Sequence, residues 1–122
     1  MEKANEQMKV RIERMIDTGK KKEDKLAHDV RWLTALSYIV AVTRGKVGKW
    51  TRHDDRVRAI KEELREFAEA TPKKSEHLPE YSEQEEELAD IILVCLTSLA
   101  ELRTDVVDLL NKKIRFNYTR KD

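Results

Sequence analysis

Two pairs of acidic residues have the spacing that a divalent metal site on helices requires. Glu63 and Glu66 lie in the segment EELRE, and Glu87 and Asp90 lie in the segment ELAD. On a helix, side chains three residues apart share a face, with their Cβ atoms about 5–6 Å apart. Two carboxylates at that separation can place oxygens on one divalent cation. The spacing alone is weak evidence, because acidic residues make up 24 of the 122 residues.

The second pair gains weight from its surroundings. Asp90 is followed by IILV in the most apolar stretch of the chain, where a carboxylate is costly unless it is paired or bound to metal. On a helical wheel Glu87, Asp90, Val94, Thr97 and Glu101 fall on one narrow stripe, which is polar except at Val94. For both acidic pairs the alternative is ion pairing with Lys or Arg on neighbouring helices, although clustered buried ion pairs are expensive.

A basic stripe near the end of the sequence supplies the opposite charge. The apolar face of the last expected helix continues as polar and basic positions at Lys113, Asn117 and Arg120. Arg and Lys in such positions can hold phosphate oxygens, Arg as a planar fork and Lys as a point charge. The alternative is that these cations only interact with the dipole at the C-terminal end of the helix.

Composition and charge restrict the class of protein. The chain has 25 Lys and Arg against 24 Asp and Glu, which argues against binding nucleic acid or membrane by bulk electrostatics. Only three Gly and two Pro are present, so an irregular all-β fold is disfavoured. The start of the sequence has no signal-peptide pattern and Cys95 is the single cysteine, so we expect a cytoplasmic protein without an internal disulfide.

Apolar periodicity and the breaks at Gly and Pro predict four or five helices in one domain, residues 1–122. The expected ranges are about 2–17, 24–43, 55–70, 82–102 and 105–118, with a solvated connection at 20–25 after Gly19. Short connections favour an all-α, antiparallel helical bundle. The second and fourth helices are apolar on more than one side, so we expect a dimer or tetramer, with a compact monomer as the alternative.

The ordered motifs resemble those of the MazG-like nucleotide pyrophosphohydrolases, a branch of the all-α nucleoside triphosphate pyrophosphatases. The family pattern is ExxE, a spacer and ExxD, and here twenty residues separate Glu66 from Glu87. The resemblance extends from about Trp32 to Arg120, with a departure at Arg65, where the family often has Gly. Residues 1–22 are a possible N-terminal helical extension. The matching segments are EELRE (62–66), EEELADIIL (85–93) and KIRFNYTR (113–120).

The resemblance implies an oligomeric, Mg²⁺-dependent enzyme, with Mn²⁺ as a possible substitute, that hydrolyses (d)NTP to (d)NMP and pyrophosphate. We expect a metal-activated water, oriented by the catalytic residues Glu63 and Glu66, to attack the α-phosphorus. The metal ligands that the resemblance implies are Glu63, Glu66, Glu87 and Asp90. The phosphate contacts that it implies are Lys113, Asn117 and Arg120.

Trp50 and His53 are the candidates for base recognition, because they follow a Gly-containing loop just ahead of the first acidic pair. Two alternative functions stay open. One is a phosphoribosyl-ATP pyrophosphohydrolase-like enzyme, which shares the superfamily and the reaction type. The other is a non-enzymatic oligomerisation or regulatory module whose acids are salt-bridged. A di-iron carboxylate site is excluded, since none of the three His follows a Glu by three residues.

Overall fold

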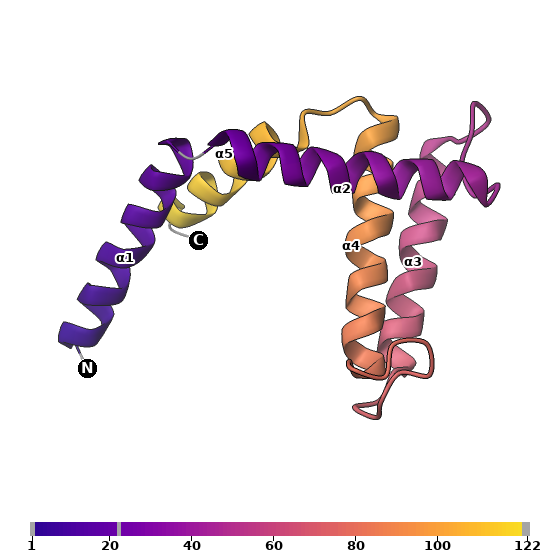
Figure 1. Ribbon diagram of the computed structural model, residues 1–122, viewed down its shortest axis with the longest axis horizontal. Coiled ribbons are helices and arrows are strands. Elements are labelled where there is room, and N and C mark those ends of the chain that lie inside the picture. The colour runs from indigo at the N-terminus through magenta and orange to yellow at the C-terminus, as the bar shows by residue number, and fades with distance from the viewer. Residues whose placement is uncertain (1, 22, 121–122) are drawn as a thin grey trace.

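The structure is a computed structural model that describes residues 2–21 and 23–120, with side chains described for 3–14 and 25–120. The described residues form five helices and no strand (Figure 1), which confirms the all-α prediction. The helices are α1 (Glu2–Lys21), α2 (Glu23–Thr43), α3 (His53–Glu69), α4 (Glu83–Glu101) and α5 (Val106–Thr119).

The predicted helix boundaries are within about two residues of the observed ones, except at the end of α1. Gly19 does not end this helix, which continues to Lys21. A glycine inside a helix costs only about 1 kcal/mol relative to alanine, and lysine is a good helix former. The predicted solvated connection at 20–25 is therefore wrong, because α1 and α2 are separated by position 22 alone, which lies outside the described residues.

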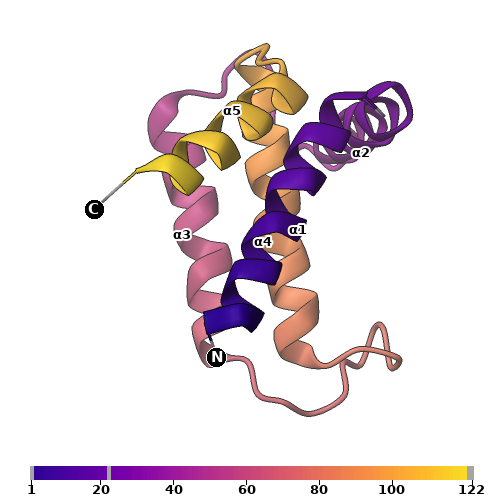
Figure 2. The same ribbon diagram turned by 90° about the vertical axis from the view of Figure 1, so that its left-hand side faces the viewer.

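The helices α3 and α4 run antiparallel, side by side, and stand across the second half of α2 (Figure 1). The helix α5 packs against α2 and lies with α1 at the end of α2 that is farthest from α3 (Figures 1 and 2). A hydrogen bond of 2.8 Å from the Tyr118 hydroxyl to Glu13 Oε1 joins α5 to α1. The α3–α4 hairpin packs under the second half of α2, and α5 packs against the first half of α2.

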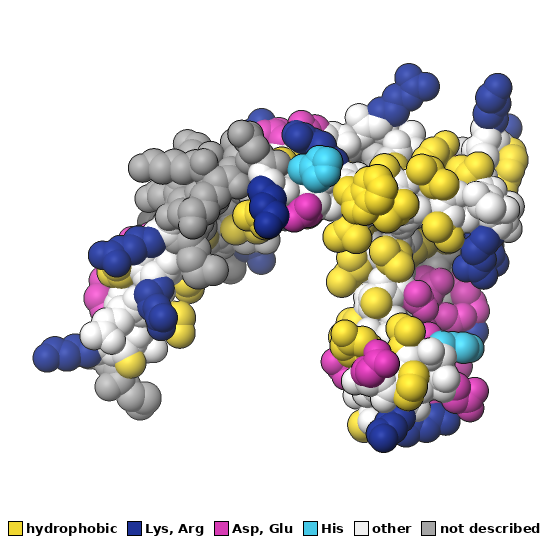
Figure 3. All heavy atoms as spheres, viewed as in Figure 1, with side chains coloured by type: hydrophobic (Ala, Val, Ile, Leu, Met, Phe, Trp, Pro, Cys, Tyr) yellow, Lys and Arg dark blue, Asp and Glu magenta, His cyan; other side chains and the backbone are white. Residues whose placement is uncertain are grey.

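A single protomer covers little of its apolar surface. Among the described side chains, the buried hydrophobic ones are Ala27, Val106 and Val107. Figure 3 shows apolar side chains gathered over α2 and on the upper part of the α3–α4 hairpin. The side chains of Trp32 and Ile39 on α2 remain 59% and 56% exposed. The apolar faces that the sequence showed on α2 and α4 are thus largely uncovered in one protomer.

The helix α4 contains the most apolar stretch of the sequence, and it also contains Asp90. In the described part of the chain, no helix combines the length and the hydrophobicity needed to cross a membrane. The thiol of Cys95 in this helix is free and half-buried, in keeping with a packing position.

Candidate functional site

Local hydrogen bonds fix where the two acid-bearing helices begin. At the start of α3, the Asp55 carboxylate accepts a hydrogen bond from the Arg52 N–H at 2.9 Å. At the start of α4, Ser82 and Glu85 form a capping box, each side chain accepting a hydrogen bond from the other's backbone N–H at 3.1 and 3.0 Å. Caps satisfy the N–H groups that a first turn leaves unpaired, and they set which residues face inward.

The loop between α3 and α4 is tied to the first two turns of α4. The Thr71 N–H donates to Glu83 Oε1 at 2.9 Å. Glu86 accepts a hydrogen bond from the Ser75 hydroxyl, and its Oε1 lies 3.2 Å from His77 Nδ1. Ser75 is a buried residue of this loop, and these contacts hold the hairpin in one register. That register sets the acidic pair of α3 opposite the acidic pair of α4.

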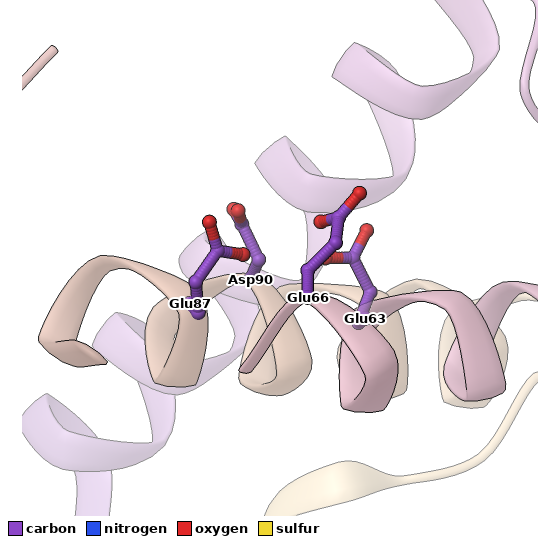
Figure 4. A group of neighbouring side chains, drawn as sticks. All are labelled: Glu63, Glu66, Glu87 and Asp90. Carbon is purple, nitrogen blue, oxygen red and sulfur yellow. The ribbon is translucent and has the colours of Figure 1, made fainter. Parts of the chain in front are cut away.

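Glu63 and Glu66 of α3 meet Glu87 and Asp90 of α4 in one acidic cluster. One carboxylate oxygen from each residue lies within 4.8 Å of the others. Figure 4 shows the four side chains projecting to the same side of the two adjacent helices. The hairpin therefore brings together the four residues that the two spacings singled out.

Glu63, Glu87 and Asp90 have raised pKa values, chiefly through burial. Burial is the largest cause of the raised pKa of Glu63, which reaches about 7, and the charges of Glu66 and Asp90 add to it. Burial, followed by the charge of Glu66, also raises the pKa of Glu87. The pKa of Asp90 is raised by burial and by neighbouring carboxylates, while the nearby Arg44 guanidinium acts in the opposite direction. The four acids together therefore favour a proton or a cation between them.

Two oxygens of the cluster, Glu63 Oε2 and Glu87 Oε2, are buried without a hydrogen-bond partner. Other acids on the same helices do have cations, as Glu69 has Arg65 at 2.8 Å. A buried carboxylate oxygen without a partner is costly in free energy. Hard oxygen donors in this number are the ligand set that Mg²⁺ and Mn²⁺ prefer. The arrangement can thus hold a divalent cation.

A groove of about 450 Å³ opens beside the cluster, between α2, α3 and α4. Glu63 and Asp90 belong to its lining, so the acidic cluster and the groove are continuous. In Figure 3 acidic side chains gather on the hairpin directly below the second half of α2. The apolar part of the lining comes from α2 and α4 and includes Leu33, Leu36, Val40, Leu93 and Val94.

Arg44 and Lys46 also line the groove, although the sequence analysis assigned them no role. They lie where α2 ends, on either side of Gly45, whose φ of 72° is a conformation that favours glycine. The sequence signal for Arg44 and Lys46 is a pair of cations on either side of a glycine, directly after an apolar helix. They place positive charge in the same groove as the carboxylates of Glu63 and Asp90.

The basic residues of α5 lie away from the acidic cluster within one protomer. Figure 1 shows α5 beside the first half of α2, separated from the α3–α4 hairpin. The Nζ of Lys113 lies 4.8 Å from the centre of the Phe116 ring on its own helix. Asn117 lies in the last turn of α5, and Arg120 is the C-cap of this helix. The structure therefore does not bring these three residues to the carboxylates of the same chain.

Trp50 and His53 are also outside the groove lining. His53 begins α3 ten residues before Glu63, which corresponds to about 15 Å along the helix axis. The Trp50 indole lies against Gly48, where an added Cβ would come within 2.8 Å of its Nε1. Their contact with a base stays a prediction.

A family model described as phosphoribosyl-ATP pyrophosphohydrolase matches residues 45–115, more than half of the chain. The matched range contains α3, α4 and most of α5, and therefore the whole acidic cluster, Lys46 and Lys113. The helices α1 and α2 precede it, and Asn117 and Arg120 follow it. No curated protein and no solved structure matches the chain.

Proposed function

The chain belongs to the phosphoribosyl-ATP pyrophosphohydrolase family, and on that basis we propose that it is a Mg²⁺-dependent nucleoside triphosphate pyrophosphohydrolase. Membership makes it a pyrophosphohydrolase, a hydrolase that acts on a phosphorus anhydride. The proposed reaction divides a nucleoside or deoxynucleoside triphosphate into the monophosphate and pyrophosphate. One observation carries the proposal: four carboxylates from α3 and α4 converge within 4.8 Å beside an apolar groove.

The four carboxylates fit a divalent cation. Two of their oxygens are buried and unpartnered, and burial together with the neighbouring carboxylates raises the pKa values of Glu63, Glu87 and Asp90. A triphosphate would add further negative charge, so the acids alone would repel it. Mg²⁺, when bound, would neutralise this charge and lower the pKa of a coordinated water. The residues that would hold it are Glu63, Glu66, Glu87 and Asp90.

Glu63 and Glu66 are the proposed catalytic residues. A carboxylate orients a water molecule by accepting a hydrogen bond from it, and a positioned base takes up the proton during attack. Both residues lie on one face of α3, and Glu63 also borders the groove. An α-phosphorus held at that end of the groove would therefore lie next to the Glu63 carboxylate, which would direct the water.

The groove is the proposed place of the nucleoside. Its apolar walls from α2 and α4 suit the faces of a base, and its acidic end suits the metal-bound phosphates. Arg44 and Lys46 line the same groove and would contact phosphate oxygens, Arg44 through a bidentate fork. These two residues supply positive charge from the same protomer as the acids.

A homodimer or homotetramer is part of the proposal. The side chains of Trp32 and Ile39 on α2 are more than half exposed, and large exposed apolar patches are typical of contact surfaces. In such an assembly Lys113, Asn117 and Arg120 would reach phosphate only at the site of a second copy. Their role as phosphate contacts therefore depends on oligomerisation.

The family description favours a second candidate substrate, phosphoribosyl-ATP, which carries the same triphosphate group. The MazG-like assignment and this one differ in the substrate and share the hydrolysis of a nucleotide anhydride. The non-enzymatic alternative needs the acids to be salt-bridged. It has less support, because Glu63 and Glu87 keep buried oxygens without a partner.

Pyrophosphate release tests the proposal when it is measured with Mg²⁺ over canonical NTPs, dNTPs and phosphoribosyl-ATP. We expect pyrophosphate and the matching monophosphate from at least one substrate, with the activity lost on adding EDTA. Asp90→Asn should abolish the activity, while Glu69→Gln, a paired acid on the same hairpin, should retain it. No pyrophosphate from any substrate in the panel would refute the proposed function.

A further inference from the structure

Two hydroxyl groups meet in the wall of the groove, where α2 packs against α4. The Oγ of Ser37 lies 2.7 Å from Oγ1 of Thr97. Both oxygens are also within hydrogen-bond distance of the Leu93 carbonyl oxygen, Ser37 at 2.7 Å and Thr97 at 2.9 Å. Both side chains line the groove, and Thr97 is only 6% exposed. This polar pair lies among the apolar residues of α2 and α4.

Proton counting shows what the pair offers to a ligand. Ser37 and Thr97 have one hydroxyl proton each. One proton must bond the Leu93 carbonyl, and the other must lie between the two hydroxyl oxygens, because two oxygens 2.7 Å apart repel without a proton between them. Both protons are then used within the protein. Lone pairs remain on both oxygens, so the pair presents hydrogen-bond acceptors to the groove.

The distance from the Ser37–Thr97 hydroxyl pair to the acidic cluster matches the length of a nucleotide. Asp90 and Thr97 both line the groove and are seven residues apart on α4, which corresponds to about 10 Å along the helix axis. This length is comparable to that between the α-phosphate of a nucleotide and the far edge of its base. A nucleotide with its phosphates beside Asp90 would therefore present that edge to Thr97 and Ser37.

We infer that Ser37 and Thr97 select nucleotides whose base carries an amino group at purine C6 or pyrimidine C4, adenine or cytosine, over the carbonyl counterparts hypoxanthine and uracil. An amino N–H donates to the free lone pairs without breaking a bond within the protein. A carbonyl oxygen at that position meets lone pairs and stays unsatisfied unless a hydroxyl gives up its internal hydrogen bond. The inference rests on the proposed function and names the substrate class of the same site.

Competition by nucleoside monophosphates tests this selectivity against whichever substrate releases pyrophosphate. The inhibition constants of AMP and IMP, and of CMP and UMP, compare ligands that differ in the amino or carbonyl group. In at least one of these pairs, we expect the wild type to bind the amino nucleotide, AMP or CMP, about tenfold more tightly than its carbonyl counterpart. A tenfold difference corresponds to the free energy of about one hydrogen bond. The double variant Ser37→Ala with Thr97→Val removes both acceptors and should bring that ratio below about threefold, since either hydroxyl alone can bond the Leu93 carbonyl and keep its lone pairs free.

Two further variants separate hydroxyl chemistry from packing. Thr97→Ser keeps the hydroxyl and should retain the wild-type ratio. Thr43→Val removes a hydroxyl that bonds the Ile39 carbonyl on an exposed face of α2, so it should also leave the ratio unchanged. Circular dichroism checks that each variant is folded.

The outcomes are distinguishable from failure of the proposed function. Absence of pyrophosphate release from every substrate would refute the function itself. Turnover with equal binding in both monophosphate pairs would overturn only the inference, as would a double variant Ser37→Ala with Thr97→Val that keeps the wild-type ratio. A change in the association state of this double variant with unchanged selectivity would assign the pair to a contact between copies, and would also overturn it.

Discussion

Glu63 on α3 and Asp90 on α4 are members of the same acidic cluster and also border the same groove. The two residues come from antiparallel helices joined by a loop that is hydrogen-bonded to the start of α4. This one relationship makes the metal end and the nucleoside end of the proposed site continuous. Changes to either residue should therefore affect both cation binding and substrate binding.

Glu63→Gln should stabilise the metal-free protein at neutral pH. The pKa of Glu63 is raised from 4.5 to about 7, chiefly by burial, so between these values the folded state holds a proton that the unfolded state has released. The free energy of unfolding that Glu63 contributes therefore falls as pH rises through this range, and the loss is complete above it. A glutamine is uncharged at every pH and removes this fall.

Thermal melts in EDTA from pH 4.5 to 8 measure this difference between wild type and Glu63→Gln. The stabilisation should be small near pH 4.5 and should grow toward pH 8. Glu69→Gln serves as the control, because that acid is paired with Arg65 and exposed. A stabilisation of Glu63→Gln that is the same at both ends of the range would contradict the pKa argument.

Mg²⁺ should bind at the acidic cluster and stabilise the folded protein. A ligand that binds only the folded state at a hundred times its Kd adds about 2.7 kcal/mol to the free energy of unfolding. Asp90→Asn and Glu87→Gln each remove a charged oxygen donor and should weaken Mg²⁺ binding at least tenfold, as measured by calorimetry. Equal Mg²⁺ affinity in the wild type and both variants would show that the cation binds elsewhere.

Arg44→Ala should raise KM for the nucleotide about tenfold, since a charge-assisted hydrogen bond to phosphate is worth roughly 1.5–3 kcal/mol. The change in kcat should be smaller, because Arg44 borders the groove and is not a member of the acidic cluster. Arg58→Ala is the matched control, as Arg58 is an exposed arginine paired with Asp55 on α3. An unchanged KM in Arg44→Ala would assign phosphate binding to other cations, such as those of α5.

The acidic cluster could be predicted from sequence because it depends on local rules. Positions three apart share a helix face, and consecutive helices of a bundle pack as antiparallel neighbours. To predict that Glu63 and Glu87 meet, it is therefore enough to know which face each helix turns inward. The apolar periodicity indicates this face, and the capping box at Ser82 indicates where α4 begins. The helix boundaries could be predicted for the same reason.

The groove and the position of α5 could not be predicted, because they depend on tertiary contacts. Arg44 lines the groove only because α2 crosses the hairpin, and a helical wheel contains no crossing angle. The turn before α5 includes Arg103 with a φ of 57°, a conformation that a non-glycine residue rarely adopts and that its sequence does not signal. After this turn Val106 and Val107 are buried, and α5 extends away from the acidic cluster.

Arg56→Met should destabilise the end of the hairpin opposite its loop. Arg56 Nε lies 3.4 Å from Glu101 Oε1, the side chains are 17% and 7% exposed, and neither atom has a hydrogen-bond partner. Removing the arginine leaves the Glu101 charge buried and unpaired, so urea denaturation should show that the free energy of unfolding falls by about 3 kcal/mol.

The double variant Arg56→Met with Glu101→Leu removes both charges and should recover most of that loss. By contrast, Arg58→Met, at an exposed pair, should change the free energy of unfolding little. A double variant as unstable as Arg56→Met alone would show that lost packing, and not an unpaired charge, causes the destabilisation.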